Sequence, residues 1–311
     1  MTAPAQCAQF HAIAQRVNNW GRWGPEDERG TLNLVTDEVV RAAAATVRSG
    51  RRVPLALPLQ QDGVQTGMIP GRVNPLHTMV AVNMELFGPG TVATSDDVVT
   101  MGLQAGTHWD ALPHVSHGGK LYNGRPADTV TAHGRAAFSG IDTAGPLVSR
   151  GVLLDVARAH GVQSLAAEHA VGPEDLDAAE ELGGVRVGQG DIVLVRTGQM
   201  RHYLAGDRDA YAHPSPGLSL YAPEWFHARD VAAVANDTLT FEIFPPEIED
   251  LWLPVHALHL VEMGMLQGQN WNLEELSLAC AEEGRYAFLL SAQPEPFTGA
   301  TGAPVAPVAV L

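Results

Sequence analysis

The residues of this chain that are best suited to chemistry lie in the segment 104–114, which reads QAGTHWDALPH. In an extended chain, residues two apart point to the same side, so Gln104, His108 and Asp110 would share one face. His108 and Asp110 could then present an imidazole nitrogen and a carboxylate to one cation, a ligand set that suits zinc or manganese. From spacing alone, hydrogen-bonded structural histidines explain the segment equally well.

Two residues beyond this pair could handle protons or polarise a carbonyl group. His114 follows Pro113, which bends the chain, so we expect its imidazole to turn back toward the same point as a general acid or base. Tyr122 lies on the next loop and could donate a hydrogen bond to a carbonyl oxygen, as groups that stabilise an oxyanion do. Both are candidate catalytic residues.

Other side chains could line an apolar pocket for a small substrate. These candidates are Trp20, Trp23, Trp109 and His77. Packing in the core or between subunits explains the tryptophans at least as well, and a structural role is favoured for His77. Glu242 and Glu247 flank two prolines, and we interpret them as part of a solvated loop.

The charge of the chain restricts its partners. Lys and Arg total 19 against 35 Asp and Glu, so the formal net charge is −16. Such a field repels phosphate backbones and anionic lipids, and we expect no nucleic-acid partner. The sequence has no stretch of 18 apolar residues and begins without a basic segment followed by an apolar one. We therefore expect no membrane partner either.

Cysteine usage and the low charged fraction suggest a location and an assembly. Cys7 and Cys280 are the only cysteines and are far apart in the sequence, which fits a reducing compartment and argues against a thiolate zinc site. We therefore expect a cytoplasmic protein. Only 17% of residues are charged, which suggests surface covered by other subunits, and we expect a homo-oligomer, either a dimer or a tetramer.

The elements that must position the candidate residues alternate between strands and helices. A helix is predicted over 37–45, with Thr36 as N-cap and acidic residues in its first turn. Further predicted helices are 173–182, 258–265 and 273–281, and the predicted strands are 52–59, 78–86, 97–103, 151–156, 191–196, 231–234 and 286–291.

This alternation predicts a single α/β domain without linkers or repeats. We expect the domain to span 36–293, preceded by an irregular N-terminal arm over 1–35. The tail, 294–311, is rich in Pro, Gly and Val, and we expect an extended segment docked on the surface or on a neighbouring subunit.

Several enzyme classes are disfavoured because their motifs are missing. No Gly-x-Gly-x-x-Gly opens a helix, which excludes a dinucleotide site of that kind. No Gly-x-Ser-x-Gly elbow is present, and neither cysteine has a histidine in a recognisable arrangement. Hydrolases with a serine or cysteine nucleophile are therefore disfavoured.

The segment 104–114 resembles the signature of the cyclase-family hydrolases, a group that includes bacterial arylformamidase (kynurenine formamidase) and isatin hydrolase. Their signature reads His-x-Gly-Thr-His-x-Asp-x-Pro-x-His. This chain matches the glycine, the threonine, two of the histidines and the aspartate in register, while its proline lies one place late. Further resemblance lies in 190–198 and in the stretch from 254 to 269, so the resemblance covers nearly the whole chain.

The resemblance implies a swivelling β/β/α fold, oligomeric assembly and hydrolysis of an amide, lactam or related carbon–nitrogen bond by a metal-bound water. The substrate would be a small molecule, with an aromatic one favoured. His108 and Asp110 would be metal ligands, and His256 is the candidate for a later histidine ligand. His114 would move the proton between the water and the leaving nitrogen.

Two residues depart from the family pattern. Gln104 replaces the first histidine of the signature, and Gln269 replaces the glutamate expected near the C-terminus. A neutral amide oxygen binds a dication more weakly than imidazole or carboxylate does, so we expect one zinc or manganese ion rather than two.

The same departures leave two alternatives open. One is a metal-free cyclase or dehydratase of natural-product metabolism, a lyase in which His114 is the acid or base while Gln104 and Gln269 orient a carbonyl group. The other is a small-molecule binding protein without catalysis.

Overall fold

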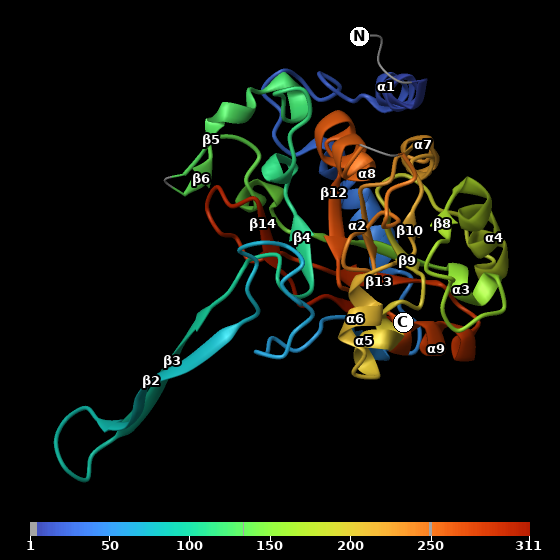
Figure 1. Ribbon diagram of the computed structural model, residues 1–311. Helices are drawn as coiled ribbons and strands as arrows, with labels where there is room; N and C mark the ends of the chain where they lie inside the picture. Colours follow the sequence, from blue (N-terminus) through green and yellow to red (C-terminus); the bar gives the residue numbers. More distant parts are fainter. Residues whose placement is uncertain (1–4, 133, 249–250) are drawn as a thin grey trace.

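The fold is built on one curved sheet of nine strands, described here for residues 5–132, 134–248 and 251–311 of a computed structural model (Figure 1). The strand order is β1-β15-β13-β7-β9-β11-β12-β4-β14. The central strands β7, β9, β11 and β12 run parallel, and all other neighbouring pairs are antiparallel. The bounds are β1 Arg52–Pro54, β4 His108–Asp110, β7 Val148–Asp155, β9 Ile192–Arg196, β11 Ala233–Asn236, β12 Leu266–Gln269, β13 Ala287–Ser291, β14 Gly302–Pro304 and β15 Val308–Val310.

The central strands are apolar along their length because both faces of the sheet are covered. In β9, Val193 and Val195 belong to one buried cluster, while Ile192 and Leu194 belong to the other. Parallel strands buried on both faces give such continuous apolar runs. The strands predicted over 151–156, 191–196, 231–234 and 286–291 are confirmed as β7, β9, β11 and β13, within a few residues at their ends.

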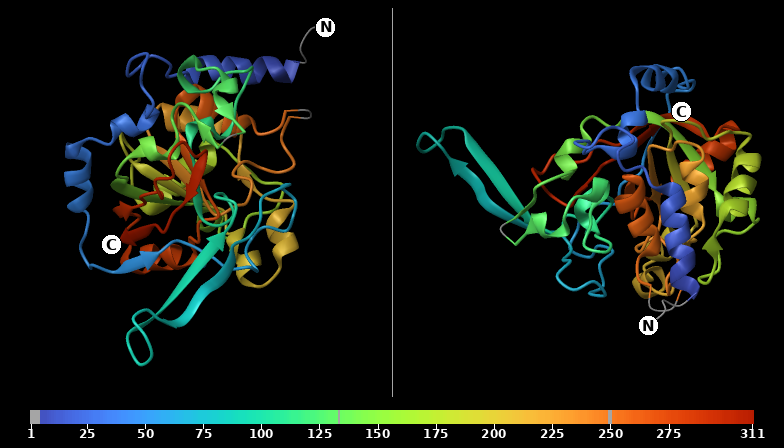
Figure 2. Two further views of the ribbon diagram at one scale, coloured as in Figure 1. Left: turned by 90° about the vertical axis from the view of Figure 1, so that its left-hand side faces the viewer. Right: turned by 90° about the horizontal axis from the view of Figure 1, so that it is seen from above.

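Helices cover the two faces of the sheet (Figures 1 and 2). Residues of α1, α4, α7 and the π-helix η6 share one buried cluster with the sheet, and residues of α9 share the other. No helix within the described ranges is long and apolar enough to cross a membrane. The helices are α1 Ala5–Val17, α2 Asp37–Ala44, α3 Val156–Ala159, α4 Pro173–Gly183, α5 Met200–Leu204, α6 Arg208–Ala212, α7 Ala222–His227, α8 Pro254–His256, η6 Ala257–Met263 and α9 Glu274–Glu283.

Short elements complete the description. The two-stranded pairs are β2 Leu76–Glu85 with β3 Ala93–Thr100, β5 Val130–Thr131 with β6 Arg135–Ala136, and β8 Ala170–Val171 with β10 Gly217–Leu218. The 3-10 helices are η1 Gly30–Leu34, η2 Leu112–His114, η3 Tyr122–Gly124, η4 Ala127–Thr129 and η5 Ile141–Ala144.

The predicted helices are present, with one change of type. Helix α2 begins after Thr36, whose hydroxyl accepts the Val39 N–H at 3.3 Å, as expected of an N-cap. The predictions over 173–182 and 273–281 correspond to α4 and α9. The helix expected over 258–265 is the π-helix η6, and the buried strand β12 that follows it was not predicted.

Both ends of the described chain differ from expectation. The segment 1–35, expected to be irregular, contains helix α1, which buries Phe10 and Ile13; residues 1–4 lie outside the described part. The tail does not lie on the surface, because β14 and β15 are strands of the main sheet and bury Ala303 and Ala309. Pairing there satisfies backbone groups that would otherwise be left open at the sheet edge.

Three predicted strands lie differently from what their sequences suggested. The strand expected over 52–59 ends at Pro54. Those expected over 78–86 and 97–103 form β2 and β3, which among the described strands pair only with each other and project from the body as a long hairpin (Figures 1 and 2). β-branched residues favour a strand wherever it lies, so their pattern alone does not show which sheet a strand joins.

Gly268 in β12 provides a test of the packing that holds β4 in place. A Cβ at this position would lie 2.6 Å from Trp271 Nε1 and 2.8 Å from Ala235 Cβ. We expect Gly268→Ala to lower the free energy of unfolding by about 1–3 kcal/mol, measured by urea denaturation. The control is Gly188→Ala, where the nearest atom would be 3.9 Å away. Equal stability of the two variants would contradict this account.

Candidate active site

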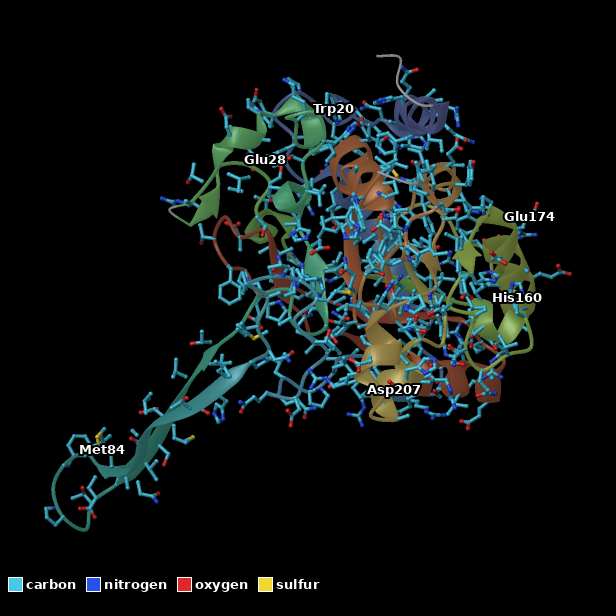
Figure 3. All side chains as sticks on the ribbon, viewed as in Figure 1. Trp20, Glu28, Met84, His160, Glu174 and Asp207 are labelled. Carbon is cyan, nitrogen blue, oxygen red and sulfur yellow. The ribbon has the colours of Figure 1, made fainter. Side chains whose placement is uncertain are left out.

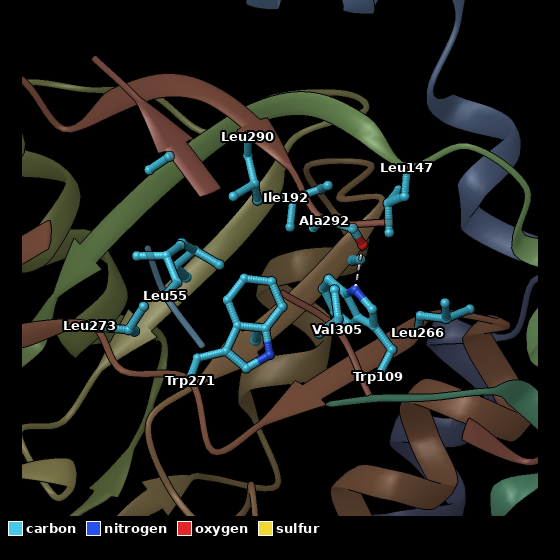
Figure 4. Packing of buried hydrophobic residues seen from close by; sticks show 14 of the residues in the cluster. Leu55, Trp109, Leu147, Ile192, Leu266, Trp271, Leu273, Leu290, Ala292 and Val305 are labelled. Atoms are coloured by element: carbon cyan, nitrogen blue, oxygen red, sulfur yellow. Dashed lines mark hydrogen bonds between the residues drawn. The ribbon is translucent and has the colours of Figure 1, made fainter. Parts of the chain in front are cut away.

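Strand β4 separates the core from the candidate site. It pairs with β12 on one side and β14 on the other, so its three residues are held along both edges. Trp109 points into the core, where its ring lies 4.9 Å from that of Trp271 and its Nε1 donates to the Ala292 carbonyl at 2.9 Å (Figure 4). Because neighbours in a strand point to opposite faces, His108 and Asp110 point away from this core. The hypothesis that Trp109 contacts substrate is therefore wrong.

His108 and Asp110 bring two unsatisfied buried atoms together. His108 Nδ1 lies 2.8 Å from the Gly106 carbonyl, which can only accept, so Nδ1 carries a proton, and in a neutral imidazole Nε2 is then the nitrogen with the lone pair. His108 Nε2 lies 3.4 Å from Asp110 Oδ1. Both side chains are fully buried, and neither of these atoms has a hydrogen-bond partner among the described residues. Two acceptors facing each other in a buried site call for a positive charge between them.

His114 joins the same group through the bend that its sequence predicted. It ends the 3-10 helix η2, and its Nε2 lies 3.6 Å from Asp110 Oδ1. Its side chain is 19% exposed, whereas those of His108 and Asp110 have no exposed surface. His114 is thus the member of this group through which protons can reach solvent.

The ionisation states of this pair differ. Burial lowers the pKa of His114 to about 4, against the opposing effect of the Asp110 carboxylate. Burial alone would raise the pKa of Asp110, but His114 and His108 outweigh it and hold that pKa well below its usual range. At neutral pH the structure therefore presents an ionised Asp110 beside a neutral His114.

His256 enters the site from α8 and is oriented by Glu242. The Glu242 carboxylate accepts from His256 Nδ1 and also from the backbone N–H groups of Val255, at 2.7 Å, and His256, at 3.2 Å. His256 Nε2 is thereby left as the acceptor, 3.8 Å from Asp110 Oδ2. Burial would lower the pKa of His256, but the Glu242 carboxylate outweighs it and raises that pKa.

Glu242 corrects the interpretation of its segment as a solvated loop. Its side chain is 3% exposed and holds a candidate ligand in place, while Glu247 accepts hydrogen bonds from the Ser219 hydroxyl and the Leu220 N–H. A carboxylate that fixes a histidine in this way is a common partner of metal-binding imidazoles. The neighbouring prolines concealed this role, because irregular backbone in sequence resembles surface loop.

Gln269 on β12 links the two sides of the site. Its Nε2 donates to Asp110 Oδ2 at 2.7 Å and lies 3.1 Å from His256 Nε2. Gln267, two residues earlier on the same face, lies 3.5 Å from the same oxygen. Gln104 does not join them: its Nε2 donates to the Thr301 hydroxyl at 3.4 Å, beside β14.

Three other candidates, Tyr122, Trp20 and Trp23, make the following contacts elsewhere in the structure. Tyr122 donates its hydroxyl to Asp27 at 2.9 Å, and burial raises the pKa of that hydroxyl. Trp20 Nε1 donates to the Val261 carbonyl at 2.7 Å. Trp23 stacks under the Arg22 guanidinium, 4.7 Å from the ring centre. None of these contacts is with Asp110 or the histidines around it, so the structure gives Tyr122 no position as an oxyanion donor.

His77 lies on the projecting hairpin rather than in the site. Its Nε2 lies 2.6 Å from Asp97 Oδ2 on the paired strand, and both side chains are more than half exposed. The expectation that His77 faces the pocket of its own chain is therefore wrong.

Arg72, at the foot of this hairpin, was not identified from the sequence. Its Cγ would lie 3.3 Å from a Cβ on Gly102. Its charge interacts with that of Asp110, contributes to the lowered pKa of His114, and opposes the rise in the pKa of His256. No motif marks this arginine, because the chain between it and His108 runs out along the hairpin and back.

A second group of possible metal ligands lies on the far side of the body, by α3 and α4 (Figure 3 labels His160). His160 Nε2 and His169 Nε2 lie 2.7 and 3.2 Å from the two oxygens of Asp175. Asp175 also accepts the Gly172 N–H at 2.9 Å, at the start of α4. Here the hydrogen bonds already satisfy the carboxylate, whereas Asp110 keeps an unsatisfied buried oxygen.

The side chains around Asp110 offer donor atoms of a kind that suits a divalent cation, although only the His160 group, among the described residues, brings three such donors within 4.8 Å of one another. The unpartnered His108 Nε2 and Asp110 Oδ1, with His256 Nε2 nearby, are nitrogen and oxygen donors of the kind that zinc and manganese take. One nitrogen of each imidazole faces the Gly106 carbonyl or the Glu242 carboxylate, which leaves the other for binding; in His108 this nitrogen has no partner, and in His256 it lies 3.1 Å from Gln269 Nε2.

Comparisons with known proteins find solved structures with a similar fold. The crystal structure of a novel cyclase matches with a TM-score of 0.86 and 34% identity, covering 95% of this chain and 100% of that one. Isatin hydrolase A from Ralstonia solanacearum matches with a TM-score of 0.63 and 21% identity, covering 88% and 97%. A predicted metal-dependent hydrolase from Bacillus stearothermophilus matches with a TM-score of 0.53 and 16% identity, covering 83% and 97%.

The last two structures are less than 25% identical to this chain and show that the fold is shared. A comparison with curated proteins finds no match. The family model described as Cyclase matches residues 22–243, which include the whole segment 104–114 and Glu242. The chain therefore belongs to the cyclase family.

Proposed function

We propose that this cyclase-family protein is a metal-dependent hydrolase that opens an amide, lactam or related carbon–nitrogen bond in a small substrate, with an aromatic substrate favoured. The observation that carries the proposal is the buried contact of His108 Nε2 with Asp110 Oδ1, two acceptors without a donor between them. The shared fold with isatin hydrolase A and with a predicted metal-dependent hydrolase supports this reaction class.

His108, Asp110 and His256 would hold one zinc or manganese ion. When bound, such an ion polarises a substrate carbonyl and lowers the pKa of water to near neutrality. Gln269 contributes no charge, and its Nε2 already donates to Asp110, so the residues present favour one ion over two.

Side chains of the protein supply the fixed charges and the proton transfer. Asp110 stays ionised at neutral pH and offers a fixed negative charge. His114 is neutral, lies at the solvent side of the site, and can accept a proton from water at Nε2 and return it to the leaving nitrogen. Arg72 places a positive charge near both, which suits the carboxylate that amide hydrolysis produces.

A second candidate function is metal-free cyclase or dehydratase chemistry with His114 as the acid or base. One observation favours it: the Gln269 amide already donates to Asp110 and lies within hydrogen-bonding distance of His256 Nε2. These contacts partly satisfy the two groups without an ion. Metal content separates the two candidates.

Metal content is measured by plasma mass spectrometry on protein purified without a nickel column. We expect about one equivalent of zinc or manganese in the unaltered protein and its loss in Asp110→Asn, because the variant removes the charge that attracts the ion. The control is His160→Gln, in the second group of ligands, which should keep the metal. Metal that is absent even after incubation with both ions, or that is lost with His160, would refute the assignment.

The role of His114 is tested by substitution. We expect His114→Gln to retain the metal and to lower kcat by roughly 10²- to 10⁴-fold, because a general acid–base group contributes about that much. Turnover would be followed by absorbance with isatin and aryl formamides as probes. If the variant turned over a substrate of the unaltered protein at the same rate, the proton would have to move through another group.

The role of Glu242 is also tested by substitution. Because its carboxylate orients His256, we expect Glu242→Gln to weaken metal affinity by roughly 10- to 100-fold, measured by competition with a chelator. Glu247→Gln is the matched control, since Glu247 accepts its hydrogen bonds from Ser219 and Leu220 instead. Equal affinities in the two variants would show that Glu242 does not act on the site.

A further inference from the structure

The Gly106 carbonyl determines which nitrogen of His108 faces Asp110, so the groups that hold this carbonyl also orient the histidine. Glycine has the freest backbone of any residue, and its peptide turns easily unless neighbours fix it. The Gly106 oxygen lies 2.8 Å from His108 Nδ1 and 3.0 Å from Asn270 Nδ2. Two donors therefore occupy the two lone pairs of one carbonyl oxygen, which fixes its direction.

Asn270 is bonded to the signature segment at two points. Its side chain contacts Gly106, and its backbone oxygen accepts the Thr107 hydroxyl at 2.6 Å. Its own N–H donates to the Thr238 carbonyl at 3.0 Å. Asn270 is fully buried and follows β12 with a left-handed φ of 59°, a conformation that asparagine adopts more readily than most residues. Buried bonds on both its backbone and its side chain make it a fixed support.

Tyr211 on α6 fixes the orientation of the Asn270 amide. Its hydroxyl lies 2.7 Å from Asn270 Oδ1. Because the Gly106 carbonyl can only accept, the amide turns its NH2 group toward Gly106 and its oxygen toward the tyrosine, which must then donate. Burial, together with the Asp237 carboxylate, raises the pKa of the Tyr211 hydroxyl well above its ordinary value. The tyrosine therefore keeps the proton that it donates.

We propose that Tyr211 and Asn270 are positioning residues for His108. Acting through the Gly106 carbonyl, they keep the proton of its imidazole on Nδ1 and leave Nε2 as an acceptor. Such support is needed because His108 Nε2 lies 3.4 Å from Asp110 Oδ1. A carboxylate is a stronger acceptor than a neutral carbonyl. If the carbonyl moved away, the proton would move to Nε2 and donate to Asp110, and Nε2 would no longer be able to bind a cation.

This support differs from the one that holds His256. Glu242 orients His256 with a negative charge, whereas Asn270 and Tyr211 are neutral and bring no second carboxylate to His108. The inference rests on the proposed function only in taking His108 Nε2 as a metal donor. The location of the ring proton is a property of the metal-free protein and can be measured there.

The first measurement locates the ring proton of His108 in metal-free protein. It uses heteronuclear NMR of protein labelled at the histidine nitrogens, at mildly alkaline pH where histidine is neutral. The His108 signals are those lost in His108→Gln. We expect the proton on Nδ1 in the unaltered protein and a partial shift to Nε2 in Asn270→Gly, which removes the amide but suits the left-handed backbone. Tyr211→Phe should shift it in the same direction.

The second measurement is zinc affinity, by competition with a chelator. We expect Asn270→Gly to weaken it by roughly 10- to 100-fold and Tyr211→Phe by roughly 10-fold, as for other outer partners of metal-binding histidines. The matched control is Tyr203→Phe on α5, since this hydroxyl lies 3.3 Å from Gln60 Nε2 and 3.3 Å from the Asp62 carbonyl oxygen. The control should change neither measurement, and circular dichroism would verify that each variant is folded.

A ring proton that stays on Nδ1 in both variants would overturn the proposal, and so would a proton on Nε2 in the unaltered protein. Weaker zinc binding with an unchanged ring would also overturn it, because the two residues would then act by another route. If the unaltered protein bound no zinc, the proposed function would fail. The same shift of the ring proton in the variants would still support the positioning role.

Discussion

Asp110 is an ionised carboxylate without exposed surface, and the arrangement of the candidate site follows from the need to compensate that charge. An unpaired buried carboxylate costs several kcal/mol or more, so donors and positive charges must gather around it. One oxygen receives the Gln269 amide, while the other faces the Nε2 atoms of His108 and His114 without a hydrogen bond. Only one oxygen of Asp110 is hydrogen-bonded, which distinguishes the site from the His160 group, where both oxygens of Asp175 are hydrogen-bonded.

The position of Asp110 depends on β4 being held between two strands. Its neighbours in register are Gln267 on one side and Gly302 on the other. A Cβ at Gly302 would lie 2.7 Å from the Trp109 carbonyl, so the edge strand can approach β4 only because that residue is glycine. The tail that supplies Gly302 is therefore part of the machinery that places the site, and Trp109 anchors β4 from the core side.

Outer residues complete the site from distant parts of the chain. Glu242 fixes the His256 ring through its Nδ1, and Arg72 brings a positive charge from the foot of the hairpin of β2 and β3. Neither belongs to the signature segment, yet one sets which nitrogen of His256 is available and the other shapes the charge that a substrate would meet. A family signature thus identifies the centre of such a site better than its periphery.

The sequence by itself determined what depends on near neighbours. The spacing of His108, Asp110 and His114 predicted that they meet, because strand alternation and a proline bend are local geometry, and continuous apolar runs predicted the central strands for the same reason. Resemblance to a family added His256 and Gln269, which the structure places beside Asp110. Tertiary structure alone decided that Trp109 faces the core, that Tyr122 is hydrogen-bonded to Asp27 and that Glu242 is buried. It also decided that the tail joins the main sheet while β2 and β3 form a separate hairpin. These outcomes rest on contacts between residues far apart in the chain, and no pattern within one segment specifies which distant surface will cover it.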